Sequence, residues 1–307
     1  MKPPRDATKW RKEASPALSP DRALDDRRIL CPWVVAIRGG FRLFYMGHGR
    51  ASAPGTTGRI LSARSGDGIT WEKEEGVRID NGEGADARAL SPCVVRLTDG
   101  ALRMYYEAYA TPDGAGSVVL SARSDDDGET FTKEPGVRVA IDGARVGSPR
   151  ALLLDGDRVR LYFHRYPEPY ASGLGRGNHV ESAVSHDGLG FVREPGVRIP
   201  QTLEPRERSA TYCAQVVAEG DGRLRAFYGA WNDDDPHHAA IMTAVSDDGG
   251  LSFTKGDAPV IDPGGPFDAA FASEPCVFAD GLGRLRMVYE GCDANGVTRI
   301  LAATSVL

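Results

Sequence analysis

The chain has 307 residues, of which 41% are hydrophobic and 26% charged, and its formal net charge is −6. This length suits one large domain or two average ones, and the composition is ordinary for a globular protein. The negative charge argues against a nucleic-acid or anionic-membrane partner, because both partners bind extended basic surfaces.

The N-terminal residues, "MKPPRDATKWRKEASPALSP", contain no apolar signal-peptide core, and no later run approaches the roughly 18 apolar residues of a membrane span. The five cysteines are odd in number and form no C-x-x-C pair, which suits free thiols in a reducing compartment. We therefore expect a soluble cytoplasmic protein without a signal peptide.

A repeat of about 60 residues runs through the chain, marked by an aromatic residue at Trp10, Trp71, Phe131, Phe191 and Phe253. Each full repeat unit contains a first apolar strand such as "CPWVVAI", a second such as "FRLFYMG", a third such as "RILSARS" and a fourth that ends in "GVRI". Short β-rich runs separated by Gly, Asp and Asn, with no helical period, predict an all-β protein.

Five units of four antiparallel strands predict a single-domain five-bladed β-propeller. The fifth unit stops at "LAATSVL" after its third strand, whereas the N-terminus supplies an orphan fourth strand around Trp10. We expect this strand to complete the last blade and close the ring, which leaves no open sheet edge. The predicted segments are 1–20 for the closing strand and 26–80, 86–140, 142–200, 205–262 and 268–307 for blades one to five, within one domain of 1–307.

The turn before the fourth strand fits an Asp-box in two units, at "SDDDGETF" from Ser124 to Phe131 and again from Ser246 to Phe253, and two other units have versions one residue shorter, "SGDGITW" and "SHDGLGF". In such a turn Asp126 accepts backbone N–H groups, Gly128 allows a positive φ, and the aromatic residue packs between blades. A residue that every blade contains serves a need that every blade shares. We therefore interpret this phrase as structural and look for the site where the blades differ.

The first strands differ at two aligned positions that should face the central channel. One position holds Cys31, Ser91, Ser148, Cys213 and Glu274, and the other holds Trp33, Cys93, Arg150, Gln215 and Cys276. The Ser and Cys residues suit the close approach of strands at a narrow hub. Glu274 and Arg150 are charged, so they are candidate site residues, as is Trp33.

The loops before the first strands pair an acid with an arginine in three units. These pairs are Asp26 with Arg28, Asp86 with Arg88, and Asp142 with Arg145. They could form ion pairs between blades or a polar cup for a hydroxyl-rich or anionic ligand.

The ends of the second strands also vary among the units. They place Glu107, His164, Arg165 and Glu290 beside Tyr109, Tyr166 and Trp231. Aromatic faces bind the C–H surfaces of sugars and charged groups bind their hydroxyls, so this mixture favours a carbohydrate ligand.

The motifs "SP-x-VV", "LRMYYEA" and "SARSxDG" recur along the chain. In these motifs the chain resembles the five-bladed β-propeller glycoside hydrolases. This clan includes arabinanases, β-xylosidases, invertases, levansucrases and mannoside phosphorylases. The resemblance implies cleavage of glycosidic bonds by two carboxyl groups, one a general acid and the other a base or nucleophile. It also implies acids on the inner strands of blades one to three, where this chain has Cys31, Ser91 and Ser148.

Two hypotheses remain open. In the first, relocated acids act on a glycosidic bond by hydrolysis or phosphorolysis: the catalytic candidates are Glu107, Glu274, Asp26, Asp86 and His164, with Glu107 or Glu274 as proton donor. Substrate would be bound by Arg150, Arg165, Arg88, Trp33, Tyr109, Tyr166, Trp231, Glu290 and Asp142. In the second, the protein is a non-hydrolytic propeller that binds a sugar or performs another chemistry in its channel.

No motif indicates a cofactor, and the spacing of histidines and acids does not define a metal site. The densest cluster, "WNDDDPHHAA", reads as a solvated loop. The expected partner is a small-molecule carbohydrate substrate, with no nucleic acid and no membrane.

Overall fold

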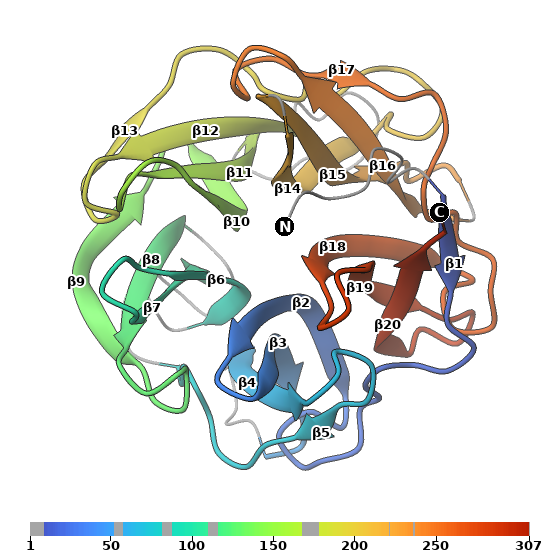
Figure 1. Ribbon diagram of the computed structural model, residues 1–307. Helices are drawn as coiled ribbons and strands as arrows, with labels where there is room; N and C mark the ends of the chain where they lie inside the picture. Colours follow the sequence, from blue (N-terminus) through green and yellow to red (C-terminus); the bar gives the residue numbers. More distant parts are fainter. Residues whose placement is uncertain are drawn as a thin grey trace.

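The computed structural model describes residues 9–51, 58–81, 88–109, 116–167, 178–220, 222–235 and 237–306. These residues form twenty β-strands and no helix, which confirms the all-β prediction. Since no helix occurs among them, none is long and apolar enough to cross a membrane. Figure 1 shows the sheets arranged around a common centre, with β2, β6, β10, β14 and β18 nearest to it.

The first three repeat units each fold into a separate antiparallel sheet of four strands that follow one another in sequence. The first sheet contains β2 (Arg28–Ile37), β3 (Gly40–His48), β4 (Arg59–Ser65) and β5 (Glu72–Lys73). The second contains β6 (Ala89–Arg96), β7 (Leu102–Tyr109), β8 (Ser117–Ser124) and β9 (Thr132–Val139). The third contains β10 (Ala144–Leu153), β11 (Val159–Pro167), β12 (His179–Ser185) and β13 (Phe191–Arg193).

The fourth and fifth units share one eight-stranded sheet, joined by a single parallel pair between Ala239 and Phe271. The fourth unit contributes β14 (Ala210–Gly220), β15 (Arg223–Trp231), β16 (Ala239–Ser246) and β17 (Thr254–Lys255). The fifth contributes β18 (Phe271–Ala279), β19 (Leu285–Cys292) and β20 (Thr298–Ser305), and β1 (Trp10–Lys12) is the fourth strand beside β20. In Figure 1 the blue β1 accordingly lies next to the red β20.

A buried arginine ties the second strand of a unit to the fourth. The Arg103 guanidinium binds the Glu134 carboxylate at 2.9 Å, and the Ser121 hydroxyl donates to that carboxylate at 2.7 Å. Equivalent trios are Arg42, Glu74 and Ser62; Arg160, Glu194 and Ser182; and Arg286, Glu13 and Thr304. In the last trio Glu13 comes from the N-terminal segment, so this segment makes the same polar contacts as the fourth strands of units one to three.

The repeated Ser-x-Asp turn forms its own hydrogen bonds. The Ser124 hydroxyl donates to Asp126 at 2.7 Å, and Asp126 accepts the backbone N–H of Thr130 at 3.0 Å. Burial alone would raise the pKa of Asp126, but the hydrogen bonds that Asp126 accepts together outweigh burial and lower the pKa to about 2. The aromatic residue that follows, Phe131, packs edge-on against Phe44 of the preceding unit with ring centroids 5.6 Å apart. Trp10, Phe191 and Phe253 make the same kind of contact with Phe227, Tyr105 and Tyr162.

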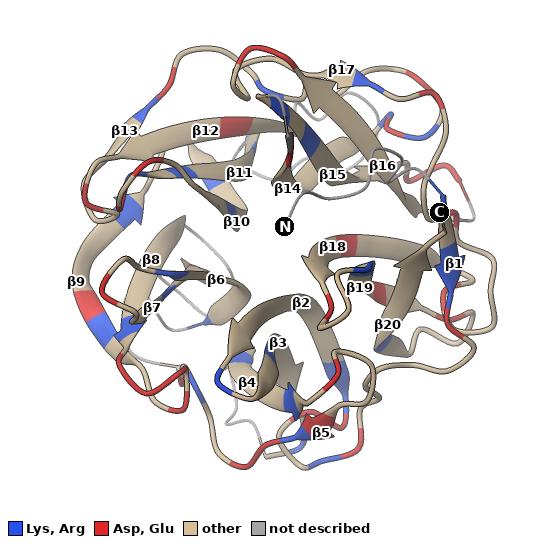
Figure 2. Cartoon of the chain, in the orientation of Figure 1, with Lys and Arg blue, Asp and Glu red and all other residues tan. Residues whose placement is uncertain are grey.

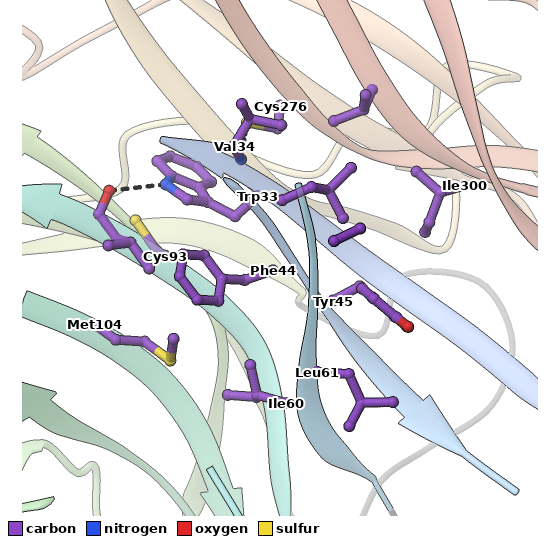
Figure 3. Packing of buried hydrophobic residues seen from close by; sticks show 14 of the residues in the cluster. Trp33, Val34, Phe44, Tyr45, Ile60, Leu61, Cys93, Met104, Cys276 and Ile300 are labelled. Atoms are coloured by element: carbon purple, nitrogen blue, oxygen red, sulfur yellow. Dashed lines mark hydrogen bonds between the residues drawn. The ribbon is translucent and has the colours of Figure 1, made fainter. Parts of the chain in front are cut away.

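The first strands are joined near the centre by side chains that bond to a neighbouring backbone. The Trp33 indole N–H donates to the Val94 carbonyl at 2.8 Å, as Figure 3 shows, and the Gln215 amide bonds to Val277 in both directions. Cys93 and Cys276 accept the backbone N–H groups of Ala151 and Val34 at 3.0 and 3.2 Å. The residues at the second aligned position of the first strands thus link neighbouring units. Trp33 links unit one to two, Cys93 two to three, Gln215 four to five, and Cys276 five to one.

The buried acids before the first strands brace the units. Asp25, which is fully buried, accepts the Tyr45 hydroxyl at 2.9 Å and lies 2.6 Å from the Lys73 ammonium. Asp268 binds Tyr289 and Lys12 in the same way, and Glu207 binds Tyr228 and Lys255. The structural acid of the first loop is therefore Asp25, whereas its neighbour Asp26 pairs with Arg50 at the surface.

Replacement of Glu134 by alanine should destabilise the protein by about 3 kcal/mol, because it leaves the nearly buried Arg103 guanidinium without its counter-charge. Chemical denaturation with urea measures this loss. The matched control is Glu75→Ala, which removes an almost fully exposed partner of Arg22 and should change stability by less than about 1 kcal/mol. Equal losses in the two variants would contradict the bracing role of Glu134.

Candidate functional site

The centre of the molecule is shaped by a backbone distortion at one position of every first strand. Five non-glycine residues at this position have positive φ angles between 43° and 55°: Cys31, Ser91, Ser148, Cys213 and Glu274. The register with the second strand shifts at each of them, as in a β-bulge. Positive φ is uncommon for residues with a Cβ, so its recurrence in five units marks a shared requirement of the fold.

Four of these bulge residues meet one another through their side chains. The Ser91 hydroxyl lies 3.4 Å from both the Cys31 thiol and the Ser148 hydroxyl, and Ser148 donates to Glu274 Oε1 at 2.7 Å. The Arg150 guanidinium binds the other carboxylate oxygen of Glu274. The bulges therefore bring units one, two, three and five together at one polar cluster.

A cavity of about 660 Å³ lies over this cluster. Six of the site residues predicted from the sequence line this cavity: Glu107, His164, Tyr166, Trp231, Glu274 and Glu290. They come from β7, β11, β15, β18 and β19, so only the tertiary structure assembles them. The structure gathers carboxyl, imidazole and aromatic groups in one place, as the variation at the second-strand ends suggested.

Two of the glutamates hold bulges of neighbouring units. Glu107 Oε2 accepts the Ser148 backbone N–H at 3.0 Å, and Glu290 Oε2 accepts the Cys31 backbone N–H at 3.2 Å. The two glutamates are both buried and occupy equivalent positions of β7 and β19. Each therefore leaves one carboxylate oxygen that does not hold the bulge.

The cavity holds two carboxyl groups in different electrostatic settings. Burial, together with the nearby negative charge of Glu274, raises the pKa of Glu290 to about 8. Glu274 instead forms an ion pair with the buried guanidinium of Arg150. The site thus combines a carboxyl that is protonated at neutral pH with one that is paired with arginine, a combination suited to general acid and base catalysis.

His164 forms a second part of the site, beside Glu107. Burial, assisted by the positive charge of Arg150, lowers the pKa of His164 to about 3, so the imidazole is neutral. Its ring stacks on Tyr166 with centroids 5.1 Å apart and meets Tyr212 edge-on at 6.0 Å. Gly147 makes room for this arrangement, since a Cβ there would lie 2.6 Å from the His164 ring and 2.7 Å from Glu107 Oε2.

An aromatic wall closes the cavity on the side of units four and five. The rings of Trp231 and Phe271 lie 5.6 Å apart, and Trp231 also meets Tyr212 at 6.4 Å. The Trp231 indole donates to Asp233 at 2.7 Å, which fixes the orientation of the ring. A flat apolar face beside carboxyl groups suits the C–H surface of a sugar ring.

The other nominated residues lie apart from the cavity lining. Arg150 and Trp33 are buried, with the guanidinium 5.4 Å from the centre of the indole ring. Arg165 approaches Glu181 at 3.8 Å. Asp26 binds Arg50, Asp142 is exposed in a turn, and Arg88 is half-buried outside the lining. Asp86 lies outside the described residues, and so does the side chain of Tyr109 at the end of β7.

Sequence reasoning missed Tyr212, which lines the cavity and occupies the space above Gly229. The second strands carry Met46, Glu107, His164 and Glu290 at the position of Gly229, so the fourth unit lacks a side chain there. The missing side chain at Gly229, together with the aromatic Tyr212 directly before the bulge residue Cys213, was the sequence feature that could have identified Tyr212 as a site residue. Cys31, Ser91 and Ser148 also line the cavity, although the sequence suggested only close packing for them.

Among the residues that the structure describes, no group of three or more His, Cys, Asp or Glu side chains could hold a metal ion. Of the candidate cluster in the loop after β15, His237 instead contacts the Ala269 carbonyl through its ring nitrogen, and the His238 ring stacks on Trp231.

Replacement of Gly147 by alanine should displace His164 and Glu107, because the new methyl group would overlap both side chains. We expect a loss of stability of about 1–3 kcal/mol. Gly190→Ala is a suitable control, since its methyl group would meet only Asp187 at 3.9 Å. Thermal unfolding of both variants measures the effect, and an unchanged melting temperature of Gly147→Ala would contradict the arrangement.

Glu290 should make the protein less stable as pH rises. Between its ordinary pKa of 4.5 and the folded-state pKa of about 8, the folded protein keeps a proton that the unfolded chain has released. The free energy of unfolding therefore falls progressively as pH rises from 4.5 to about 8. The destabilisation is complete above this range and absent below it. His164 acts in the opposite direction, since its stability contribution is lost as pH falls from 6.5 towards about 3.

Glu290→Gln should remove the alkaline penalty, so its free energy of unfolding should rise relative to the wild type between pH 5 and pH 8. Urea denaturation at several pH values measures this difference, with Glu75→Gln as an exposed control. A difference that does not change with pH would show that Glu290 titrates normally.

Comparison with known proteins gives a consistent assignment of fold. No family model matches the chain. Over 131 residues it is 34% identical to the uncharacterized protein MT1551 of Mycobacterium tuberculosis strain CDC 1551 / Oshkosh, which covers 39% of this chain and 41% of that protein. Rv1502 of strain ATCC 25618 / H37Rv matches to the same extent. The match thus spans about two fifths of the length of these curated relatives.

Similar solved structures cover nearly the whole chain. A glycoside hydrolase is 18% identical over 98% of this chain and 93% of its own, with a TM-score of 0.77. A structure from the GH130 family of mannoside phosphorylases, described as containing glycoside hydrolases that target β-1,2 mannosidic linkages in Candida mannan, is 16% identical over 98% and 95%, with a TM-score of 0.72. The endo-arabinase of Bacteroides thetaiotaomicron is 15% identical over 95% and 98%, with a TM-score of 0.71. The resemblance indicated by the repeat wording is confirmed for the fold: this chain has the fold of these glycoside hydrolases.

Proposed function

We propose that this protein is a carbohydrate-active enzyme that acts on a glycosidic bond in the central cavity. The observation that supports this most directly is the meeting of Glu107, Glu274 and Glu290 in one cavity with an aromatic wall. Two carboxyl groups with different protonation states are what cleavage of a glycosidic bond requires. The fold shared with glycoside hydrolases adds support.

In this proposal the repeat units are the blades of a five-bladed β-propeller, with the boundaries predicted from the repeat. The pairing of β1 with β20 supports a ring closed by the N-terminal strand, as do the side-chain bonds between first strands. The five cysteines are free and buried, which supports a reducing, cytoplasmic location.

Glu290 would donate a proton to the leaving oxygen, because its pKa of about 8 keeps it protonated at neutral pH. Glu274, held by Arg150 and by the Ser148 hydroxyl, would serve as the base or nucleophile. Arg150 then acts as a positioning residue beneath the cavity. Neutral His164 and Glu107 would bind sugar hydroxyl groups.

A panel of aryl glycosides and oligosaccharides, assayed with and without phosphate, tests this proposal. We expect turnover of at least one substrate, and a fall in kcat of about 100-fold or more in Glu290→Gln. Glu274→Gln should be similarly impaired, whereas the exposed control Glu75→Gln should match the wild type. The wild-type rate should decline above about pH 8 as Glu290 loses its proton. Full activity of Glu290→Gln on a turned-over substrate would exclude it as the acid.

A second candidate function, sugar binding without turnover, is favoured by one observation. Cys31, Ser91 and Ser148, which stand where the resemblance implies acids, are neutral and contact one another. For a binding protein the same panel should yield ligands that raise the melting temperature, with no product formed by the wild type.

A further inference from the structure

The rim of the cavity is chemically divided between the units. Three residues before each bulge residue the chain has Arg28, Arg88, Arg145, Ala210 and Phe271, in the order of the units. All of these except Arg88 line the cavity. Units one to three thus present arginine at this position, whereas units four and five present apolar side chains.

Arg28 opens β2 and lies directly across the strand pair from His48. Its side chain is exposed at the cavity rim, and no carboxylate among the described residues forms an ion pair with it. Burial lowers the pKa of His48, and the positive charges of Arg27, Arg28 and Arg88 lower it further. Arg27, Arg28 and Arg88 therefore all lie close enough to His48 to act on its charge.

Arg145 lines the same cavity from the third unit and is held by an aromatic ring. Its guanidinium carbon lies 6.0 Å from the centre of the Tyr166 ring, a cation–π contact. Tyr166 in turn stacks on His164. Arg145 is thus placed over the part of the cavity that contains the candidate site.

The charges are separated by depth as well as by unit. The three glutamates are buried in the cavity, where an acidic group on a ligand would meet other carboxyl groups. At the rim such a group would instead meet arginine, while the flat face of the ligand could rest on Trp231 and Phe271. Elsewhere, acidic and basic residues are mixed over the outer turns and strands, as Figure 2 shows.

We propose that the cavity binds an oxyanion at Arg28 and Arg145, and that this oxyanion is the carboxylate, sulfate or phosphate substituent of an acidic saccharide. The saccharide part rests on the proposed function. Arginine suits this role, because its planar guanidinium forms paired hydrogen bonds with such groups. Free inorganic phosphate, as a co-substrate, would accept the same guanidinium hydrogen bonds, so phosphate and acidic sugars must be titrated separately.

Binding of matched sugars tests the proposal without requiring turnover. D-glucuronate and D-galacturonate are compared with D-glucose and D-galactose by saturation-transfer NMR and calorimetry, and inorganic phosphate is titrated alone. We expect the uronates to bind more tightly than their neutral counterparts. Arg28→Ala and Arg145→Ala should each weaken uronate binding about tenfold and leave neutral sugars unchanged. The matched control is Arg223→Ala, because Arg223 is exposed and does not line the cavity.

The outcomes separate the sources of the anion. If phosphate alone binds, depends on Arg28, and the uronates gain nothing over neutral sugars, the oxyanion is free phosphate. Should none of the anions bind, or should both arginine variants bind uronate and phosphate like the wild type, the proposal is wrong. Arg28→Glu, at an exposed position, provides a charge reversal that should abolish anion binding without affecting folding, as a thermal unfolding curve verifies. Uronate binding in a protein that cleaves no glycoside would support this inference while contradicting the proposed catalysis.

Discussion

The left-handed backbone at one position of each first strand determines where the chemistry of this molecule lies. A residue with a Cβ adopts positive φ only at an energetic cost, of order 1 kcal/mol or more, and surrounding contacts must offset it. Here the offset comes partly from Glu107 and Glu290, which accept the backbone N–H groups of Ser148 and Cys31. The same contacts that stabilise two bulges thus hold two carboxyl groups over the central cluster.

The balance of desolvation and charge pairing then sets the state of each buried group. Glu274 is ion-paired with Arg150. For Glu290, burial and the nearby negative charge of Glu274 outweigh the hydrogen bonds from Cys31 and the positive charge of Arg28, so Glu290 retains its proton. His164 cannot gain a proton cheaply because it is buried close to Arg150. Three groups of ordinary chemistry acquire different roles from their surroundings alone. This is the pattern expected of a site for proton transfer.

Much of the fold and of the candidate site could be predicted from the sequence repeat. The spacing of Trp10, Trp71 and Phe131 located the strands, and comparison among units singled out Glu274 as the one acid at its position. It also identified Glu107, His164 and Glu290 as variable strand ends, and all four residues line the cavity. Such comparison succeeds because side chains at equivalent positions of a repeated fold must point in equivalent directions.

Other features could not be read because they depend on contacts between distant units. The sequence could not show that Asp25, rather than Asp26, is the buried acid, since only the fold brings Tyr45 and Lys73 to it. Nor could it show that Arg150 reaches from unit three to Glu274 of unit five, or that Tyr212 fills the space above Gly229. The assignment of roles to the glutamates likewise required their burial, because a pKa depends on surroundings that are distant in sequence.

The protonation state of Glu290 is the most direct test of this view of the site. Protein labelled with ¹³C at the glutamate carboxyl carbons can be titrated by NMR, with the Glu290 signal assigned by its absence from Glu290→Gln. A pKa of about 8 is expected. A value near the ordinary 4.5 would mean that Glu290 is ionised at neutral pH, and the cavity would then lack the proton donor on which its proposed chemistry depends.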